Sequence, residues 1–187
     1  MKKPLALVAG ITLLCLVGSA AFAGWTVVNL HPTDATRSYA SGASGGHQAG
    51  DARIGGQTHA GLWSGTAATW VDLNPSGATY SHALGISGNQ QMGEANIGGV
   101  THAGLWTGTA GSWVDLNPTG AGRSYAGGTS GDQQAGYAYF GGNYHAGVWS
   151  GTAGSWVDLN PSGASSSFAY AVSGGQQVGS VFDHAGL

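Results

Sequence analysis

The chain has 187 residues, of which 36 are glycine and 7% are charged, and its formal net charge is −3. A single cysteine and five lysine and arginine residues exclude a disulfide framework within the chain and a basic surface for nucleic acid or anionic membranes. The length is that of one domain.

The first 23 residues predict a secretory signal. Two lysines precede an apolar stretch, residues 5–17, and Ala21-Phe22-Ala23 fits an A-x-A cleavage site. The stretch is short for a membrane span, so we expect cleavage, secretion to the extracellular space or cell envelope (periplasm), and no membrane association afterwards. Cleavage would remove Cys15 and both lysines and leave three arginines against eight acidic residues, a formal charge of −5.

Residues 24–187 form the second predicted region, an array with a period of 43 residues. His102-Ala-Gly-Leu-Trp106, followed by Trp113-Val-Asp-Leu-Asn-Pro118, recurs 43 residues earlier and 43 residues later. All seven tryptophans lie in this segment or in a degenerate N-terminal copy of it. A fixed period of this size is typical of repeat architectures.

Each copy predicts four short strands. In the second copy, the first strand ends at Ser87 and the pair Gly88-Asn89 predicts a tight hairpin turn. Alternate residues of the next strand, 91–97, are fixed between copies while those between them vary, which is typical of a half-buried strand. Gly98-Gly99 predicts a second turn, the His-Ala-Gly-Leu-Trp segment a third strand, and Trp-Val-Asp-Leu-Asn-Pro a fourth strand that proline ends.

We therefore expect an all-β fold of tandem four-stranded antiparallel repeats, with no helices in residues 24–187. Four short antiparallel strands in about 43 residues are typical of a β-propeller blade; another stacked or prism-like sheet array is the alternative. Residues 25–32 resemble a fourth strand and residues 184–187 the start of a third. If they complete one blade, four blades close into a ring; otherwise the chain is truncated at its C-terminus and belongs to a larger propeller. The sequence leaves both open.

The repeat resembles the bacterial extracellular HAF repeat, which is named for its His-Ala-Phe core. The resemblance rests on His-Ala at residues 59, 102, 145 and 184, and on the upstream Gly-x-Gln-x-x-Gly at 131–136 and 174–179. This chain departs from the pattern at the third position, where glycine replaces phenylalanine. The resemblance implies a secreted repeat protein and no particular mechanism.

The recurrent polar residues suggest sites that must be weighed against structural roles. The recurrent histidines (His59, His102, His145, His184) could converge on a transition metal, but a residue that every copy repeats more often satisfies a partner between strands. The segment that begins at Asp72 resembles a calcium loop but supplies one carboxylate, where calcium needs several. We therefore expect no metal and no cofactor, and we expect the Asp and Asn side chains to cap a turn.

The tryptophans could stack on sugars, but they are also the largest groups available to fill a glycine-rich core. The better candidate for a binding surface is the variable side of the second strand in each copy: Asp51, Arg53, Glu94, Asn96, Tyr137 and Tyr139. No motif of a catalytic nucleophile or phosphate loop is present, so we expect no enzyme. We expect a non-enzymatic interaction scaffold whose partner is a protein or a carbohydrate; a lectin-like module and a fragment without independent function are the alternatives.

Overall fold

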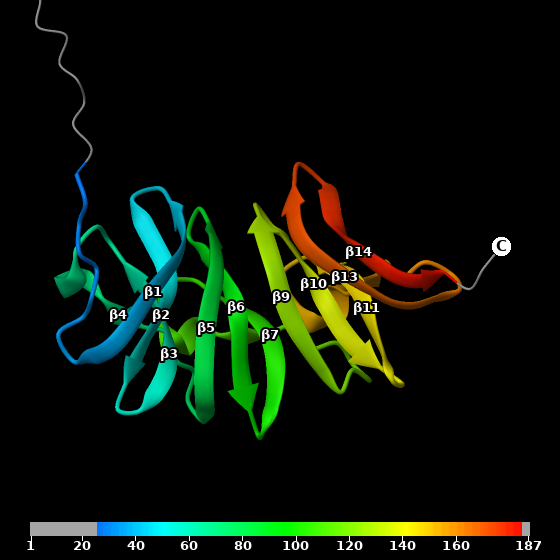
Figure 1. Ribbon diagram of the computed structural model, residues 1–187, viewed down its shortest axis with the longest axis horizontal. Coiled ribbons are helices and arrows are strands. Elements are labelled where there is room, and N and C mark those ends of the chain that lie inside the picture. The colour runs from blue at the N-terminus through cyan, green and yellow to red at the C-terminus, as the bar shows by residue number, and fades with distance from the viewer. Residues whose placement is uncertain (1–25, 185–187) are drawn as a thin grey trace, which may run out of the picture.

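The computed structural model describes residues 26–184, which from Ala35 onward form short antiparallel strands joined mainly by glycine turns (Figure 1). The first sheet contains β1 (Ala35–Ser44), β2 (His47–Ile54), β3 (Gln57–Trp63) and β4 (Val71–Asp72). The second contains β5 (Ala78–Ser87), β6 (Gln90–Ile97), β7 (Val100–Trp106) and β8 (Val114–Asp115). The third contains β9 (Arg123–Ser130), β10 (Gln133–Phe140), β11 (Asn143–Trp149) and β12 (Val157–Asp158). The fourth contains β13 (Ala164–Ser173) and β14 (Gln176–His184).

The all-β prediction is confirmed for these residues. Helical structure is limited to three single 3₁₀ turns, η1 (Ala67–Thr69), η2 (Ala110–Ser112) and η3 (Ala153–Ser155), each between the third and fourth strands of its copy. No helix in the described part of the chain is long and apolar enough to cross a membrane. The predicted signal and Trp25 lie outside the described residues.

The glycine pairs form the hairpins predicted for them. Gly98 and Gly99 adopt φ of 61° and 87° between β6 and β7, a conformation that costs other residues a steric penalty and that two-residue turns require. The pairing that follows is regular: Gly93 lies opposite Gly104, and Gln91 lies opposite Trp106.

Consecutive sheets pack on one another through the first strand of the later sheet. β5 contacts β1, β2 and β3; β9 contacts β5, β6 and β7; β13 contacts β9, β10 and β11. The core therefore lies between copies. Leu73 of the first copy packs with Trp106 of the second, and Leu116 of the second packs with Trp149 of the third.

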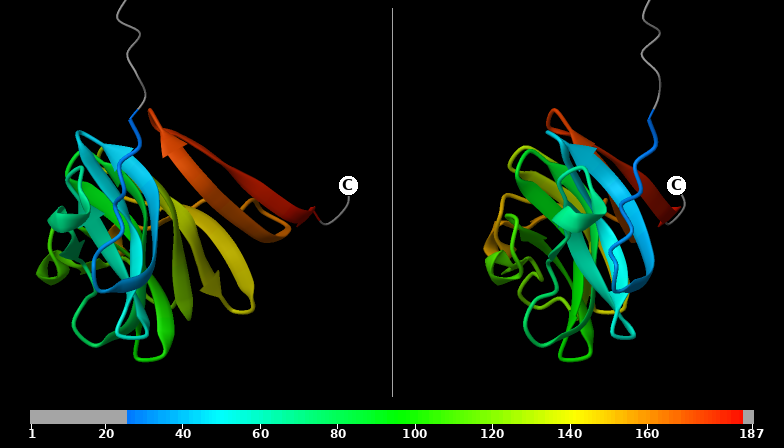
Figure 2. Two further views of the ribbon diagram at one scale, coloured as in Figure 1. Left: turned by 60° about the vertical axis from the view of Figure 1, so that its left-hand side comes forward. Right: turned by 90° about the vertical axis from the view of Figure 1, so that its left-hand side faces the viewer.

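Three predicted details of the ends and strands are wrong. The fourth strand is only two residues long, because its Leu leaves the sheet for the core and its Pro starts the link. Residues 26–34 form no strand. They do not pair with β14, and the first and fourth sheets lie at opposite ends of the molecule (Figures 1 and 2), so the described residues do not form the closed ring that the sequence left open. His184 starts no third strand: it ends β14, opposite Ala164. The Gly-Gly pair that turns the chain at this point in the other copies is missing after Phe182.

Candidate functional site

In each of the first three copies, the repeated histidine pairs with an aspartate of the same sheet; the side chain of His184 lies outside the described residues. The distance from His Nδ1 to Asp Oδ2 is 2.7 Å for His59–Asp72, 2.6 Å for His102–Asp115 and 2.6 Å for His145–Asp158. Since an ionised carboxylate only accepts hydrogen bonds, Nδ1 is the protonated nitrogen. Among the described residues, no group of three or more His, Cys, Asp or Glu side chains is placed to hold a metal ion. The histidines thus have the partner between strands that the structural interpretation predicts.

The His–Asp pair belongs to a chain of hydrogen bonds that joins one copy to the next. Asp72 Oδ1 accepts the backbone N–H of Asn74 at 2.8 Å, which confirms the predicted turn cap. Ser81, on the first strand of the next sheet, donates to Asn74 Oδ1 at 2.6 Å and accepts the Ala60 N–H at 2.9 Å. Ser81 is fully buried. The equivalent Ser124 and Ser167 accept the Ala103 and Ala146 N–H groups at 3.0 Å.

The link before the first sheet keeps this geometry with a different residue. His31 occupies the position of Asn74; its Nδ1 lies 2.9 Å from Ser38 Oγ and its Nε2 lies 2.9 Å from the Ala35 carbonyl. The carboxamide of Asn74 makes the same two contacts, with Ser81 and with the Ala78 carbonyl. The imidazole therefore replaces the carboxamide, and residues 29–38 are a degenerate copy of the link.

The tryptophans form one tilted pair in each of the first three copies, with ring centroids 4.6 Å apart. Trp63, Trp106 and Trp149 are 0% exposed, so these three cannot stack on a sugar. Their partner rings lie on the glycine of the His-Ala-Gly segment. A Cβ added to Gly104 would lie 2.1 Å from Trp113 Cη2, which explains why glycine stands at this position.

The repeated glutamine of the second strand is also used internally. Gln91 Oε1 accepts the Gly108 N–H at 2.8 Å, and its Nε2 donates to the Asn89 carbonyl at 3.1 Å. Gln48 and Gln134 make the same pair of contacts. The residues that repeat are therefore joined to one another: we call these His, Asp, Asn, Ser, Gln, Gly and Trp positions the frame.

All six candidate binding residues lie on the side of each sheet that packs on the next copy. Along this side of β2 the side chains run from the core to solvent: Ala49 is 0% exposed, Asp51 is 7% exposed, and Arg53 is exposed. In β6, Met92 is buried while Glu94 and Asn96 are partly exposed, and Tyr137 and Tyr139 of β10 are also partly exposed. The structure thus places five of these residues where the packed side opens to solvent, whereas Asp51 is buried.

The first of these positions in each copy meets variable residues of the first strands. Glu94 lies opposite His82 in the β5–β6 ladder, and Tyr137 lies opposite Tyr125 in the β9–β10 ladder. Between copies, Asp51 Oδ2 lies 3.1 Å from His82 Nδ1, and the rings of Tyr137 and Phe168 lie 4.8 Å apart. Since β6 also contacts β9, these pairs follow one another in one row. We call it, with Arg53, Asn96 and Tyr139, the variable rim: Tyr39, Asp51, His82, Glu94, Tyr125, Tyr137, Phe168, Arg53, Asn96 and Tyr139.

Sequence reasoning missed the first-strand members of this rim. Tyr39, His82, Tyr125 and Phe168 precede an alanine in every copy but differ in type. That variation was the available signal. It did not show which strand of one copy faces the next.

The two ends of the rim differ in chemistry. At the first and second copies, the hydrogen bond to Asp51 raises the pKa of His82 against the opposing effect of burial. Burial raises the pKa of Glu94, and the nearby His82 opposes that rise. At the third copy, burial and the charge of Glu94 raise the pKa of Tyr137 to about 12, so this hydroxyl stays protonated.

Aromatic rings gather at the third and fourth copies. Tyr125 stacks on Tyr137 at 5.0 Å, and Tyr144 lies edge-on to Tyr137 at 5.6 Å. The Arg123 guanidinium lies 4.9 Å from the centroid of the Tyr139 ring. These two residues line a cavity of about 260 Å³ between the second and third copies, together with Gly99, Val100, Thr101 and Gly122.

The chain matches no known family, curated protein or solved structure with which it was compared. The geometry of the frame and the rim therefore carries the functional argument.

Proposed function

We propose that the protein is a non-enzymatic binding protein whose frame holds the copies in place and whose variable rim contacts a partner. One observation carries this proposal: the residues that repeat are joined to each other, whereas the residues that differ meet in one row that opens to solvent. Side chains that the packing does not require in every copy are available to contact a partner.

Three further parts of the proposal rest on the sequence pattern. The N-terminal signal supports secretion to the extracellular space or the cell envelope. The His-Ala and Gly-x-Gln-x-x-Gly positions support a place among the HAF repeats. Four-stranded sheets that follow one another in chain order support a propeller-like arrangement.

A carbohydrate is the second candidate for the partner class, and the cavity beside Arg123 favours it. Tyr139, Arg123 and Thr101 are among the residues that line this cavity of about 260 Å³. An aromatic ring can contact the apolar face of a sugar, and guanidinium and hydroxyl groups can bond to its hydroxyls. The buried tryptophans do not contribute to this candidate.

The two partner classes can be separated with one pair of proteins. The wild type and the double variant Arg123→Ser/Tyr139→Ser are labelled and applied to a glycan array. Wild-type binding to defined glycans that the variant loses would support the carbohydrate. If no glycan binds, the same two proteins are cross-linked in an extracellular or envelope fraction. If the partner is a protein, we expect the wild type to capture one that the variant does not. If the variant behaves as the wild type in both assays, the part of the rim at Tyr139 and the neighbouring Arg123 are not the binding surface.

A further inference from the structure

Within the described residues, the fourth sheet exposes a strand edge that the other three sheets cover. In the first three sheets the second strand lies between the first and third strands; in the described part of the fourth, β14 pairs only with β13. Val178, Val181 and Phe182 on β14 are 63%, 42% and 53% exposed. An uncovered, apolar strand edge is a template for pairing with another strand.

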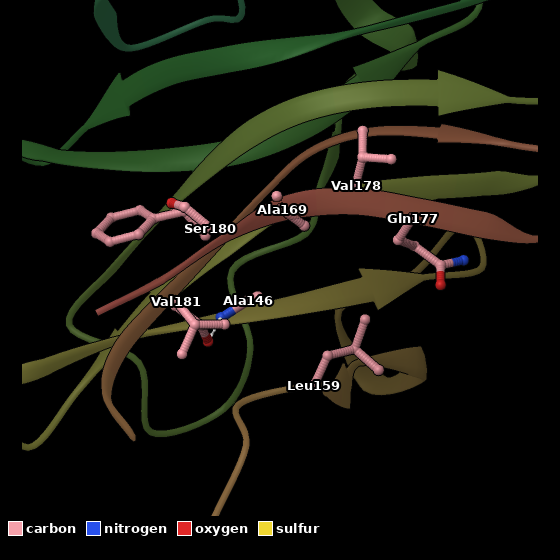
Figure 3. Close-up of a pocket in the computed structure, with 10 residues that line it drawn as sticks. Ala146, Leu159, Ala169, Gln177, Val178, Ser180 and Val181 are labelled. Carbon is pink, nitrogen blue, oxygen red and sulfur yellow. Dashed lines mark hydrogen bonds between the residues drawn. The ribbon is translucent and has the colours of Figure 1, made fainter. Parts of the chain in front are cut away.

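A groove of about 200 Å³ runs beside this edge (Figure 3). Leu159, Ala146, Ala169 and Val181 form its apolar surface, and Gln177 lies at one end. Leu159 is 38% exposed here, whereas the equivalent Leu73 and Leu116 are 0% exposed. The leucine that follows the fourth strand is therefore packed against a neighbouring side chain in the first two copies but is partly open to solvent in the third.

The earlier copies show what that cover is. Trp106, at the end of β7, packs with Leu73, and Trp149, at the end of β11, packs with Leu116. Two residues beyond each of these tryptophans, the N–H of Gly108 or Gly151 donates to the second-strand glutamine at 2.8 Å. Gln177 occupies the same position in β14, and its Nε2 donates to the Gly175 carbonyl at 3.0 Å as in the other copies. Its Oε1 is the acceptor that such a strand would use.

We propose that the β14 edge binds an extended peptide segment of another protein, of the type His-Ala-Gly-Leu-Trp-(Ser/Thr)-Gly, by antiparallel strand addition. The register of β6 with β7 sets the pairs: the peptide glycine opposite Gly179, its leucine opposite Val178 and its tryptophan opposite Gln177. Backbone hydrogen bonds along the added strand supply affinity. The order of its side chains, in which the small alanine and glycine precede the large leucine and tryptophan, supplies specificity. A second copy of this chain is the poorer occupant, because β3, β7 and β11 are each bonded on both sides within their own sheets. This site is separate from the cavity beside Arg123 and does not depend on the proposed function.

The test uses a fluorescein-labelled peptide of residues 100–108, Val-Thr-His-Ala-Gly-Leu-Trp-Thr-Gly, titrated with the purified protein and followed by fluorescence anisotropy. We expect saturable binding, weakened about tenfold or more in a peptide with alanine in place of tryptophan, which loses the apolar cover. Leu159→Asp should weaken binding by about tenfold or more for the same reason. The control Val157→Asp places the same charge on an exposed side chain two residues away and should bind as the wild type does.

Each outcome decides the proposal. Saturable binding that both the alanine peptide and Leu159→Asp weaken, with Val157→Asp unchanged, supports it. No saturable binding to folded wild-type protein, or binding that neither change weakens, overturns it. Self-association in sedimentation velocity that Leu159→Asp abolishes would make a second copy the occupant and would also overturn it. Circular dichroism of each variant identifies one that fails to fold, and the peptide substitution tests the idea without any change to the protein.

Discussion

The frame and the variable rim belong to the same strands but differ in how their residues are used. In the frame, Ser81 accepts the Ala60 N–H and donates to Asn74, and Ser124 and Ser167 accept the equivalent N–H groups of the next two copies. In the rim, the positions of Glu94 and Tyr137 are equivalent, yet one carries a half-buried acid and the other an aromatic ring. Repetition in this molecule marks a hydrogen bond or a close approach that every copy needs. Variation marks places where the packing between copies accepts several chemistries.

The largest expected effect is at the glycine under the tryptophan. Gly104→Ala puts a methyl group 2.1 Å from the Trp113 ring, and we expect it to lower the free energy of unfolding by about 3 kcal/mol through overpacking. The control Gly111→Ala has no neighbour within 4 Å and should stay within about 0.5 kcal/mol of the wild type. Urea denaturation measures both. Equal effects of the two changes would remove close approach as the reason for the repeated glycine.

The serine between copies should have the next largest effect. Ser81→Ala leaves the Ala60 N–H and Asn74 Oδ1 without their partner in a buried position, and we expect a loss of about 2 kcal/mol. Ser76→Ala, at an exposed position five residues earlier, is the matched control and should change stability by less than about 0.5 kcal/mol. A neutral Ser81→Ala would show that the frame does not depend on this hydrogen bond.

The rim should instead give a pH dependence. Because the pKa of His82 is raised in the folded state, its contribution to stability is complete below its ordinary pKa of about 6.5 and is lost as pH rises through the folded value. Glu94, with its pKa raised by burial, acts in the same direction at lower pH. We expect the wild type to be less stable at pH 8 than at pH 6, and His82→Gln and Asp51→Asn to reduce that difference. A difference that both variants retain would assign it to other groups.

The smallest expected effect is at the outer end of the rim. Arg53 is exposed, so Arg53→Ser should change the free energy of unfolding by less than about 0.5 kcal/mol. A thermal melt beside the wild type checks this. A loss above 1 kcal/mol would place Arg53 in the frame.

The sequence predicted the strands and hairpins because those depend on local chemistry. Gly98-Gly99 needs positive φ whatever lies beyond the hairpin, and the alternation in β6 reports one buried side. The contacts between copies depend on which strand of one sheet meets the next, and a period does not contain that information. Ser81 repeats as faithfully as His59, but its role became visible only with β5 packed on β3. The prediction that a third strand starts at His184 was wrong because His-Ala-Gly occurs there without the preceding glycine pair that turns the chain in the other copies.

The central claim is that the rim contributes less to stability than the frame does, and Glu94 tests it most directly. Burial raises the pKa of this acid, which means that its charged form costs stability in the folded protein. The measurement is the free energy of unfolding of Glu94→Gln at pH 8 beside the wild type. The account predicts equal or greater stability for the variant; a loss as large as that of Ser81→Ala would contradict it and make the rim part of the frame.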